Sequence, residues 1–432
     1  MKTLYYRISK YLSRLEDRIA FYPTLLGLTG VILAFLVYYI ESKGISSDLE
    51  ESIPGLLIND IATARLILAT FIGGLISIMV FSFSMVMILL NNASRNFSPR
   101  VLPGIISNRR HQIVLGVFVG NLLFFIFVLI SIDPRGDEYQ LPGFSVLLSI
   151  IGMIFSLAMF VFFIHSVSQE IQVENVMKRV FFTSRRRLVS LLEDEEPESH
   201  KFENTDDWHD IKTEESGYLQ AISLNSILRT AVEHNYKLSI LPIKGDYVFK
   251  GDILCKVNRI LDEEEISELY SNFIFSSDER VEENYVLGFK QITEIAVKAM
   301  SPGINDPGTC INAIDYLTEL FILRMKKNDE SFLQHEDQLI VKLRTADFKV
   351  ILYSVMASLR TYVTHDIIIV NKLFSMLKVL LLSTEILTEK YRLAVMMEIE
   401  NLYQDALKSI ENERDIKVFE NKLESLKALV KY

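Results

Sequence analysis

The chain has 432 residues, half of them hydrophobic, and a formal net charge of -10 at pH 7. An acidic chain lacks the basic footprint that nucleic-acid binding needs, which argues against nucleic acid as a partner. The hydrophobic excess is concentrated before about residue 168 and is too large for an ordinary soluble protein of this size, so the composition predicts a membrane protein.

The first segment, residues 1–20, is predicted to form an amphipathic helix that lies on the inner leaflet of the bilayer. Its apolar residues recur at helical spacing, and basic residues separate them. The apolar positions are Leu4, Ile8, Tyr11, Leu12, Leu15 and Ile19. The leader is long and no small-residue cleavage pattern follows it, so we do not expect a cleaved signal peptide.

Four apolar windows follow within residues 21–168. Each is long enough to cross the hydrocarbon core of a bilayer, which takes about 20 apolar residues in a helix. They run from Phe21 to Ile40, Leu66 to Leu90, Ile113 to Ile132 and Phe144 to Val167. None contains Asp, Glu, Lys or Arg. Transporters that move protons place ionisable residues inside their spans, so this absence argues against a proton relay, whereas a passive channel needs no such residue.

Lys and Arg gather before the first window, between the second and third, and after the fourth. The other two loops are mainly acidic. Because cytoplasmic loops carry the excess of Lys and Arg, both termini are expected in the cytoplasm.

The helical pattern of the second window continues to about Phe97 and carries a polar stripe, since Thr70, Ser77, Ser84 and Asn91 recur every seven residues and share one helix face. One interpretation is a packing seam, where small residues allow close approach and the hydroxyls bond across helices or back to carbonyl oxygens of their own helix. The other is a face that lines a water-filled pathway between several copies of the helix. In the third window, Gly116 and Gly120 form a GxxxG pair, a common signal for helix packing.

The remainder is predicted to be cytoplasmic and to divide into three parts. Residues 169–217 continue as a helix and then become an acidic linker, residues 218–283 form a small α/β module, and residues 284–432 form a mainly helical domain. The fold class is therefore an α-helical four-span transmembrane region plus a cytoplasmic α/β module and a helical C-terminal domain. Cys255 and Cys310 are expected to be free thiols.

The string "AMSPGINDPGTC" interrupts the helical pattern of the last part. Pro302 disfavours the helical conformation at Ser301, and Gly303 can adopt the left-handed conformation that ends a helix. Asp306 is a good N-cap and Pro307 fits the first helical position, so a second helix starts there. The string is either a rigid corner or a specific contact, with Ser301, Asn305 and Thr309 as donors for an anion at the new helix start.

Signatures of enzymes and metal sites are missing. There is no phosphate-binding glycine loop, no H-E-x-x-H and no cysteine pair at zinc spacing, so we expect no catalytic residue, no metal and no cofactor. The acidic run at Asp262 to Glu265 is interpreted as the solvated start of a helix.

Several strings together resemble a known family: "NFSPRVL", "HQIVLGVFVGNLLFF", "FFIHSVSQEIQVENV", "SGYLQAISLNSIL", "GDYVFKGDILCKV" and "GFKQITEIAVKAMSPGINDPGTCINAIDYL". In this order they are similar to the bacterial predicted membrane proteins of the domain of unknown function 2254 family. The resemblance covers residues 60–380 and implies a multi-span topology in the bacterial inner membrane. Where the family usually has a bulky residue after the second proline, this chain has Gly308.

Two functions from different classes remain open. The first is a homo-oligomeric, channel-like protein in which the second span lines a pathway for an ion or small ligand. The second is a membrane-anchored scaffold or signalling protein whose cytoplasmic part binds a partner or small ligand.

Overall fold

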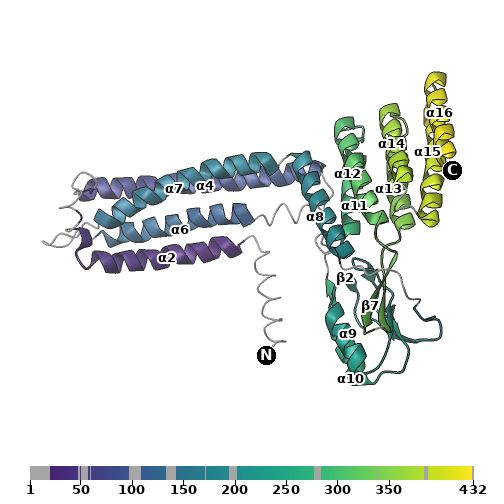
Figure 1. Cartoon of the computed structure of the whole chain (residues 1–432). Coiled ribbons are helices and arrows are strands. Elements are labelled where there is room, and N and C mark those ends of the chain that lie inside the picture. The colour runs from purple at the N-terminus through teal and green to yellow at the C-terminus, as the bar shows by residue number, and fades with distance from the viewer. Residues whose placement is uncertain are drawn as a thin grey trace. The chain divides into compact units, whose positions relative to one another are not determined.

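The computed structural model describes residues 20–46, 49, 57–58, 60–96, 109–132, 143–170, 172–193, 202–276, 284–336, 338–383 and 388–430. Its contacts divide the chain into two units, residues 1–95 with 101–172 and residues 96–100 with 173–432. The first unit contains four long helices, and the second contains strands and further helices (Figure 1). The amphipathic helix predicted for residues 1–20 lies outside the described residues, Ala20 excepted.

The four predicted spans are confirmed as four helices that are long and apolar enough to cross a membrane. They are α2 (Phe21–Glu41), α4 (Ile61–Asn96), α6 (Arg109–Ser131) and α7 (Gly143–Glu170). Helix α4 begins earlier than the apolar window because Asp60 accepts a hydrogen bond of 2.7 Å from the backbone N–H of Thr63.

Helices α2 and α6 pack closely at their glycines. A Cβ on Gly120 would lie 2.8 Å from the carbonyl oxygen of Leu26, and one on Gly116 would lie 2.5 Å from Leu26 Cδ1. A Cβ on Gly30 would collide with the backbone of Gly120. These glycines therefore let two backbones approach to a distance that no other residue permits.

The other two helices of the unit are joined to α6 by polar and aromatic contacts. The side-chain amide of Asn121 donates to the carbonyl oxygen of Gly152 on α7 at 2.9 Å and to Ser156 Oγ at 2.7 Å. Helix α4 reaches α6 through the ring pair Phe71–Phe125, with centroids 5.9 Å apart. Asn121, a polar residue within the third span, thus contributes to the packing of α6 on α7.

The second unit contains two sheets. A five-stranded sheet has the order β1-β5-β3-β8-β7, and a three-stranded antiparallel sheet has the order β4-β2-β6. The strands are β1 (His209–Lys212), β2 (Gly217–Ile222), β3 (Leu238–Ile240), β4 (Tyr247–Val248), β5 (Ile253–Val257), β6 (Phe273–Ser276), β7 (Glu330–His335) and β8 (Gln338–Arg344). Helices α9 (Leu224–Glu233) and α10 (Glu263–Ser271) lie between the strands in sequence.

The larger sheet recruits strands from both sides of residues 218–283, the range predicted for the α/β module. Strand β3 pairs in parallel with β8, with Leu238 opposite Val341, so the pairing joins residues about a hundred positions apart. Strand β1 lies in the stretch predicted as acidic linker and pairs with β5. Only one side chain of β1, Ile211, is buried, so the strand carries too little apolar pattern to stand out in the sequence.

Seven helices complete the described part of the second unit: α8 (Val173–Glu193), α11 (Tyr285–Ala299), α12 (Pro307–Met325), α13 (Phe348–Val363), α14 (Ile367–Leu382), α15 (Glu389–Ser409) and α16 (Glu413–Val430). Helices α11, α13 and α15 pack in succession, as do α12, α14 and α16, and α11 also packs on α12 and α15 on α16. A series of aromatic contacts connects α11, α12, α13 and α15. The ring centroids are 4.7 Å apart for Phe289–Phe321, 5.9 Å for Phe321–Phe348 and 4.6 Å for Phe348–Tyr391.

Candidate functional site

The polar stripe of α4 lies on the outside of the four-helix unit. Thr70, Ser77, Ser84 and Asn91 are all exposed. Four of the buried residues of the same helix also recur every seven positions: Leu68, Leu75, Ser82 and Leu89. The two series are offset by two residues, or about 200° around a helix of 3.6 residues per turn. The stripe therefore faces away from the neighbouring helices of its own chain.

The three hydroxyls of the stripe bond to the helix that carries them. Thr70, Ser77 and Ser84 donate to the carbonyl oxygens four residues earlier, at 2.7, 2.9 and 2.9 Å. Such bonds use the hydroxyl proton and leave the oxygen lone pairs facing outward. Within the described residues, the hydrogen bonds of all three hydroxyls stay inside α4. These bonds fit either interpretation of the stripe, whereas its exposure shows that it is not a packing seam within one chain.

The SPGINDP string forms the turn between α11 and α12. The backbone N–H of Asp306 donates to the carbonyl oxygen of Ala299 at 2.8 Å, which closes the turn. The Asp306 carboxylate caps α12 by accepting from the backbone N–H of Thr309 at 3.0 Å, and Pro307 is the first helical residue. Ser301 Oγ donates to the carbonyl oxygen of Lys298 at 2.7 Å.

Two features of this corner differ from the sequence-based interpretation. The left-handed residue is Asn305, with φ of 52°, and Gly303 does not have a positive φ. Asparagine tolerates this conformation because its short polar side chain costs little there. Pro302, Gly303 and Gly308 are exposed, and a Cβ on Gly308 would lie 3.3 Å from Oδ1 of the capping Asp306.

The start of α12 is already occupied by a charge of this chain. Hydrogen bonds from the Thr309 hydroxyl and backbone N–H lower the pKa of Asp306, which keeps its carboxylate ionised at neutral pH. A second anion would compete with this carboxylate for the same donors. The geometry therefore disfavours an anion at this helix start and supports a corner whose conformation is held from within.

Beside the corner lies a groove of about 930 Å³ between α11 and α13, closed at one end by the loops at residues 243–246 and 344–347. Ser301 is the residue of the SPGINDP string that lines it. On α13 its lining includes Ser354, Ala357, Ser358 and Thr361, small residues at helical spacing, together with the larger Val350, Ile351, Val355 and Tyr362. The spacing of these small residues is visible in the sequence. That α11 lies opposite them and completes the groove is not.

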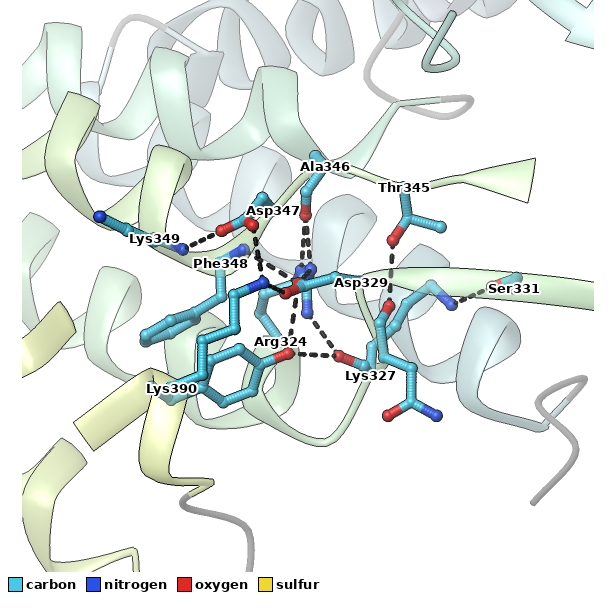
Figure 2. A network of polar contacts seen from close by, with 12 residues as sticks. Arg324, Lys327, Asp329, Ser331, Thr345, Ala346, Asp347, Phe348, Lys349 and Lys390 are labelled. Atoms are coloured by element: carbon cyan, nitrogen blue, oxygen red, sulfur yellow. Dashed lines mark hydrogen bonds and ion pairs between the residues drawn. The ribbon is translucent and has the colours of Figure 1, made fainter. Parts of the chain in front are cut away.

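A buried polar network fixes the ends of three helices near this groove (Figure 2). The fully buried guanidinium of Arg324, near the end of α12, donates to the carbonyl oxygen of Ala346 at 2.5 Å and pairs with Asp329 at 2.5 Å. Lys390, at the start of α15, reaches Asp329 at 2.5 Å and Asp347 at 2.8 Å. Asp347 in turn caps α13 by accepting from the backbone N–H of Lys349 at 2.7 Å.

The two cysteines are buried and unpaired, as expected for free thiols. Burial raises the pKa of both the Cys255 and the Cys310 thiol to about 12, so neither is a reactive thiolate at neutral pH. Within the described ranges, no group of three or more His, Cys, Asp or Glu is arranged to hold a metal ion.

The fold and these features define a membrane protein with four apolar helices long enough to span a bilayer and a second unit of strands and helices. The chain matches the family described as "Predicted membrane protein (DUF2254)" over residues 16–379 and belongs to that family. It is 23% identical over 350 residues to uncharacterised proteins of Mycobacterium bovis and Mycobacterium tuberculosis. The match covers 77% of this chain and 66% of each relative, slightly less than two thirds of their length. No solved structure matches the chain.

Proposed function

We propose that the chain is a channel-like homo-oligomer of the bacterial inner membrane, with both termini in the cytoplasm. Several copies of α4 surround a pathway for an ion or a small polar solute. The second unit assembles or gates the copies. No catalysis is assigned to the protein.

The observation that carries the proposal is the direction of the α4 stripe. Ser77 and Ser84 lie opposite the face that packs on the protein, so in a single copy they meet lipid. Small polar residues on a lipid-facing surface gain nothing from lipid, whereas in an assembly they contact water or a second helix. Because the hydroxyl protons of Ser77 and Ser84 are bonded within the helix, their Oγ atoms offer hydrogen-bond acceptors to water or a solute in the pathway.

A second candidate function is favoured by the groove in the extramembrane unit. In that case the spans serve as an anchor and the groove binds a partner or small ligand that controls signalling. The two functions differ in one measurable respect, since only the first requires water at the α4 stripe.

The test is ion flux through the full-length protein in liposomes, with Ser77→Leu/Ser84→Leu as the variant. The matched control is Thr29→Leu on α2, because Thr29 is also an exposed hydroxyl bonded to its own helix, at 2.7 Å from the Leu26 carbonyl oxygen. We expect flux in the wild type and in the control, and at least a tenfold loss in the double variant.

A second readout detects water directly. Cysteines introduced one at a time at positions 77, 84 and 29 are treated with a membrane-impermeant thiol reagent. The native thiols are buried and do not interfere. Modification at 77 and 84 but not at 29 supports the pathway. No flux and no modification at any of the three would leave the anchored scaffold as the function.

A further inference from the structure

Helix α8 has two faces that differ in what they contact. One face packs on α11 and α12. Its buried residues are Val176, Met177, Val180, Phe181, Ser184 and Leu188. The ring of Phe181 stacks on that of Tyr316 in α12, with centroids 4.6 Å apart. Because this face is fixed in the protein, the opposite face of α8 points away from the helices that carry it.

The opposite face consists of one aromatic ring surrounded by basic side chains, and we call it the basic–aromatic face. Its centre is Phe182, which is 55% exposed. On a helix surface, the neighbours of a residue lie three and four positions away in both directions. For Phe182 these four positions are Lys178, Arg179, Arg185 and Arg186. Only 45 of the 432 residues are Lys or Arg, so the average composition does not explain four basic neighbours out of four.

Most cations of the basic–aromatic face have no partner within the protein. Lys178 pairs with Glu174, one turn earlier on the same helix, at 2.7 Å. In the described part of the chain, the guanidinium groups of Arg179, Arg185 and Arg186 form no ion pair and no hydrogen bond, and all three residues are exposed. A guanidinium binds phosphate oxygens through two parallel hydrogen bonds. The face therefore complements a surface that carries phosphates.

The connection to the fourth apolar helix holds the start of α8 close to a bilayer. Helix α7 ends at Glu170, and α8 begins at Val173. Three residues extend over at most about 11 Å, so the first turn of α8 stays within reach of the headgroups at the end of that span.

The exposed ring of Phe182 distinguishes the basic–aromatic face from an ordinary solvated helix face. A helix face that meets only water gains nothing from a large apolar ring. A helix at a membrane interface uses such a ring, which enters the boundary between headgroups and acyl chains while Lys and Arg side chains extend to the headgroups.

We propose that the basic–aromatic face of α8 binds anionic lipid headgroups of the bilayer that the four apolar helices span. Phe182 enters the boundary with the acyl chains, and Arg179, Arg185 and Arg186 bind lipid phosphates around it. The proposal does not depend on a pathway at α4, because it requires only that α8 lies next to a bilayer.

The test measures how close α8 lies to lipid in nanodiscs that contain the full-length protein. A fluorophore is attached to Val189→Cys, seven residues after Phe182 and therefore on the same face. The native thiols are buried and do not compete for the label. A nitroxide on a small share of the lipid headgroups quenches the fluorophore. We expect at least twofold stronger quenching in phosphatidylcholine with phosphatidylglycerol than in phosphatidylcholine alone. This difference should vanish at 1 M salt, where the screening length falls to about 3 Å.

Charge variants assign the effect to the three arginines. A basic residue near an anionic surface contributes roughly a fivefold change in binding, so Arg179→Gln/Arg185→Gln/Arg186→Gln should lower the ratio of bound to free α8 on the order of a hundredfold. The difference between the two lipid mixtures should then disappear. Arg179→Lys/Arg185→Lys/Arg186→Lys keeps the charge and should retain the difference, which separates a loss of charge from a loss of folding.

Two further variants complete the test. The matched control Lys212→Gln/Lys250→Gln/Arg414→Gln removes three exposed cations from other parts of the second unit and should leave the quenching unchanged. Phe182→Ser retains all four cations and should weaken the quenching in both lipid mixtures, because the ring no longer enters the acyl boundary.

Three results would overturn the proposal. Equal quenching with and without phosphatidylglycerol would show that the face does not recognise anionic lipid. An equal loss in the control and in the arginine variant would assign the effect to the net charge of the whole chain. No quenching in either mixture would mean that the face meets water or another protein.

Discussion

The guanidinium of Arg324 and the carboxylate of Asp329 form an ion pair across the turn between α12 and β7, and the arginine side chain has no exposed surface. Asp329 also accepts hydrogen bonds from the backbone N–H of Phe348 at 3.1 Å and from the Tyr391 hydroxyl at 3.2 Å (Figure 2). One carboxylate therefore joins the end of α12 to the starts of α13 and α15.

Replacement of Arg324 by methionine should lower the free energy of unfolding by about 3–5 kcal/mol, because Asp329 loses one of its two cationic partners and the carbonyl oxygen of Ala346 loses its Arg324 donors. Chemical denaturation of the full-length protein in detergent measures the change. The control is Lys372→Ala, which removes the more exposed Lys372–Asp315 pair and should cost about 1 kcal/mol or less. Equal losses in both variants would contradict a structural role for the buried network.

The same carboxylate gives the stability a defined dependence on pH. Burial raises the pKa of Asp329, but the Lys390 hydrogen bond and the Arg324 charge lower it more, so its pKa lies below the ordinary value. A lowered pKa in the folded state adds stability above about pH 4 that is lost as the pH falls through the folded pKa. The stability difference between wild type and Asp329→Asn should therefore be largest near pH 6 and shrink towards pH 3. Denaturation curves at several pH values check this, and a difference that stays constant would contradict it.

The elements that the sequence predicted are those with a local signal. The spans were recognisable because an uncharged apolar run of about 20 residues matches the thickness of a bilayer core and rarely occurs in soluble domains. The helix start at Asp306-Pro307 was recognisable because cap and proline act within one turn. The left-handed residue of the same corner was wrongly assigned to Gly303, because glycine is permissive but asparagine can also adopt the conformation.

What the sequence did not reveal depends on contacts between distant residues. Nothing in the local sequence indicates that β3 pairs with β8. The burial of Arg324 is equally unexpected from the sequence, because a charged side chain by itself predicts exposure. The polar stripe of α4, with one polar residue in every seven, was visible in the sequence. Whether it faces the neighbouring helices or the outside of the unit was not. Its offset from the buried series became clear only once the neighbouring helices were in place.

A third prediction concerns the close contact of α2 and α6. Gly120→Val should prevent this contact, because a Cβ would lie 2.8 Å from a backbone oxygen that cannot move aside. Overpacking of this kind costs about 1–3 kcal/mol or more, and we expect a lower melting temperature and reduced yield from membranes. Gly73→Val is the control, since no atom lies within 4 Å of its Cβ position. A control as damaging as Gly120→Val would show that a second copy packs at Gly73.

The last prediction separates backbone strain from steric contact at two similar turns, Lys244-Gly245-Asp246 and Lys250-Gly251-Asp252. Both glycines have positive φ, 97° and 95°, and in each turn the aspartate accepts a hydrogen bond from the backbone N–H three residues earlier, at 3.1 and 2.9 Å. A Cβ on Gly251 would meet no atom within 4 Å, whereas one on Gly245 would collide with the side chain of Asn284, the N-cap of α11.

Gly251→Ala should therefore cost about 1–2 kcal/mol, the strain of the backbone conformation alone. Gly245→Ala should cost clearly more, because it also displaces the Asn284 cap, whose loss is worth about 1 kcal/mol. Chemical denaturation of the two variants measures the difference. Gly245 and Asn284 both line the groove between α11 and α13. Equal effects of the two substitutions on stability would mean that Asn284 moves aside freely and does not fix this end of the groove.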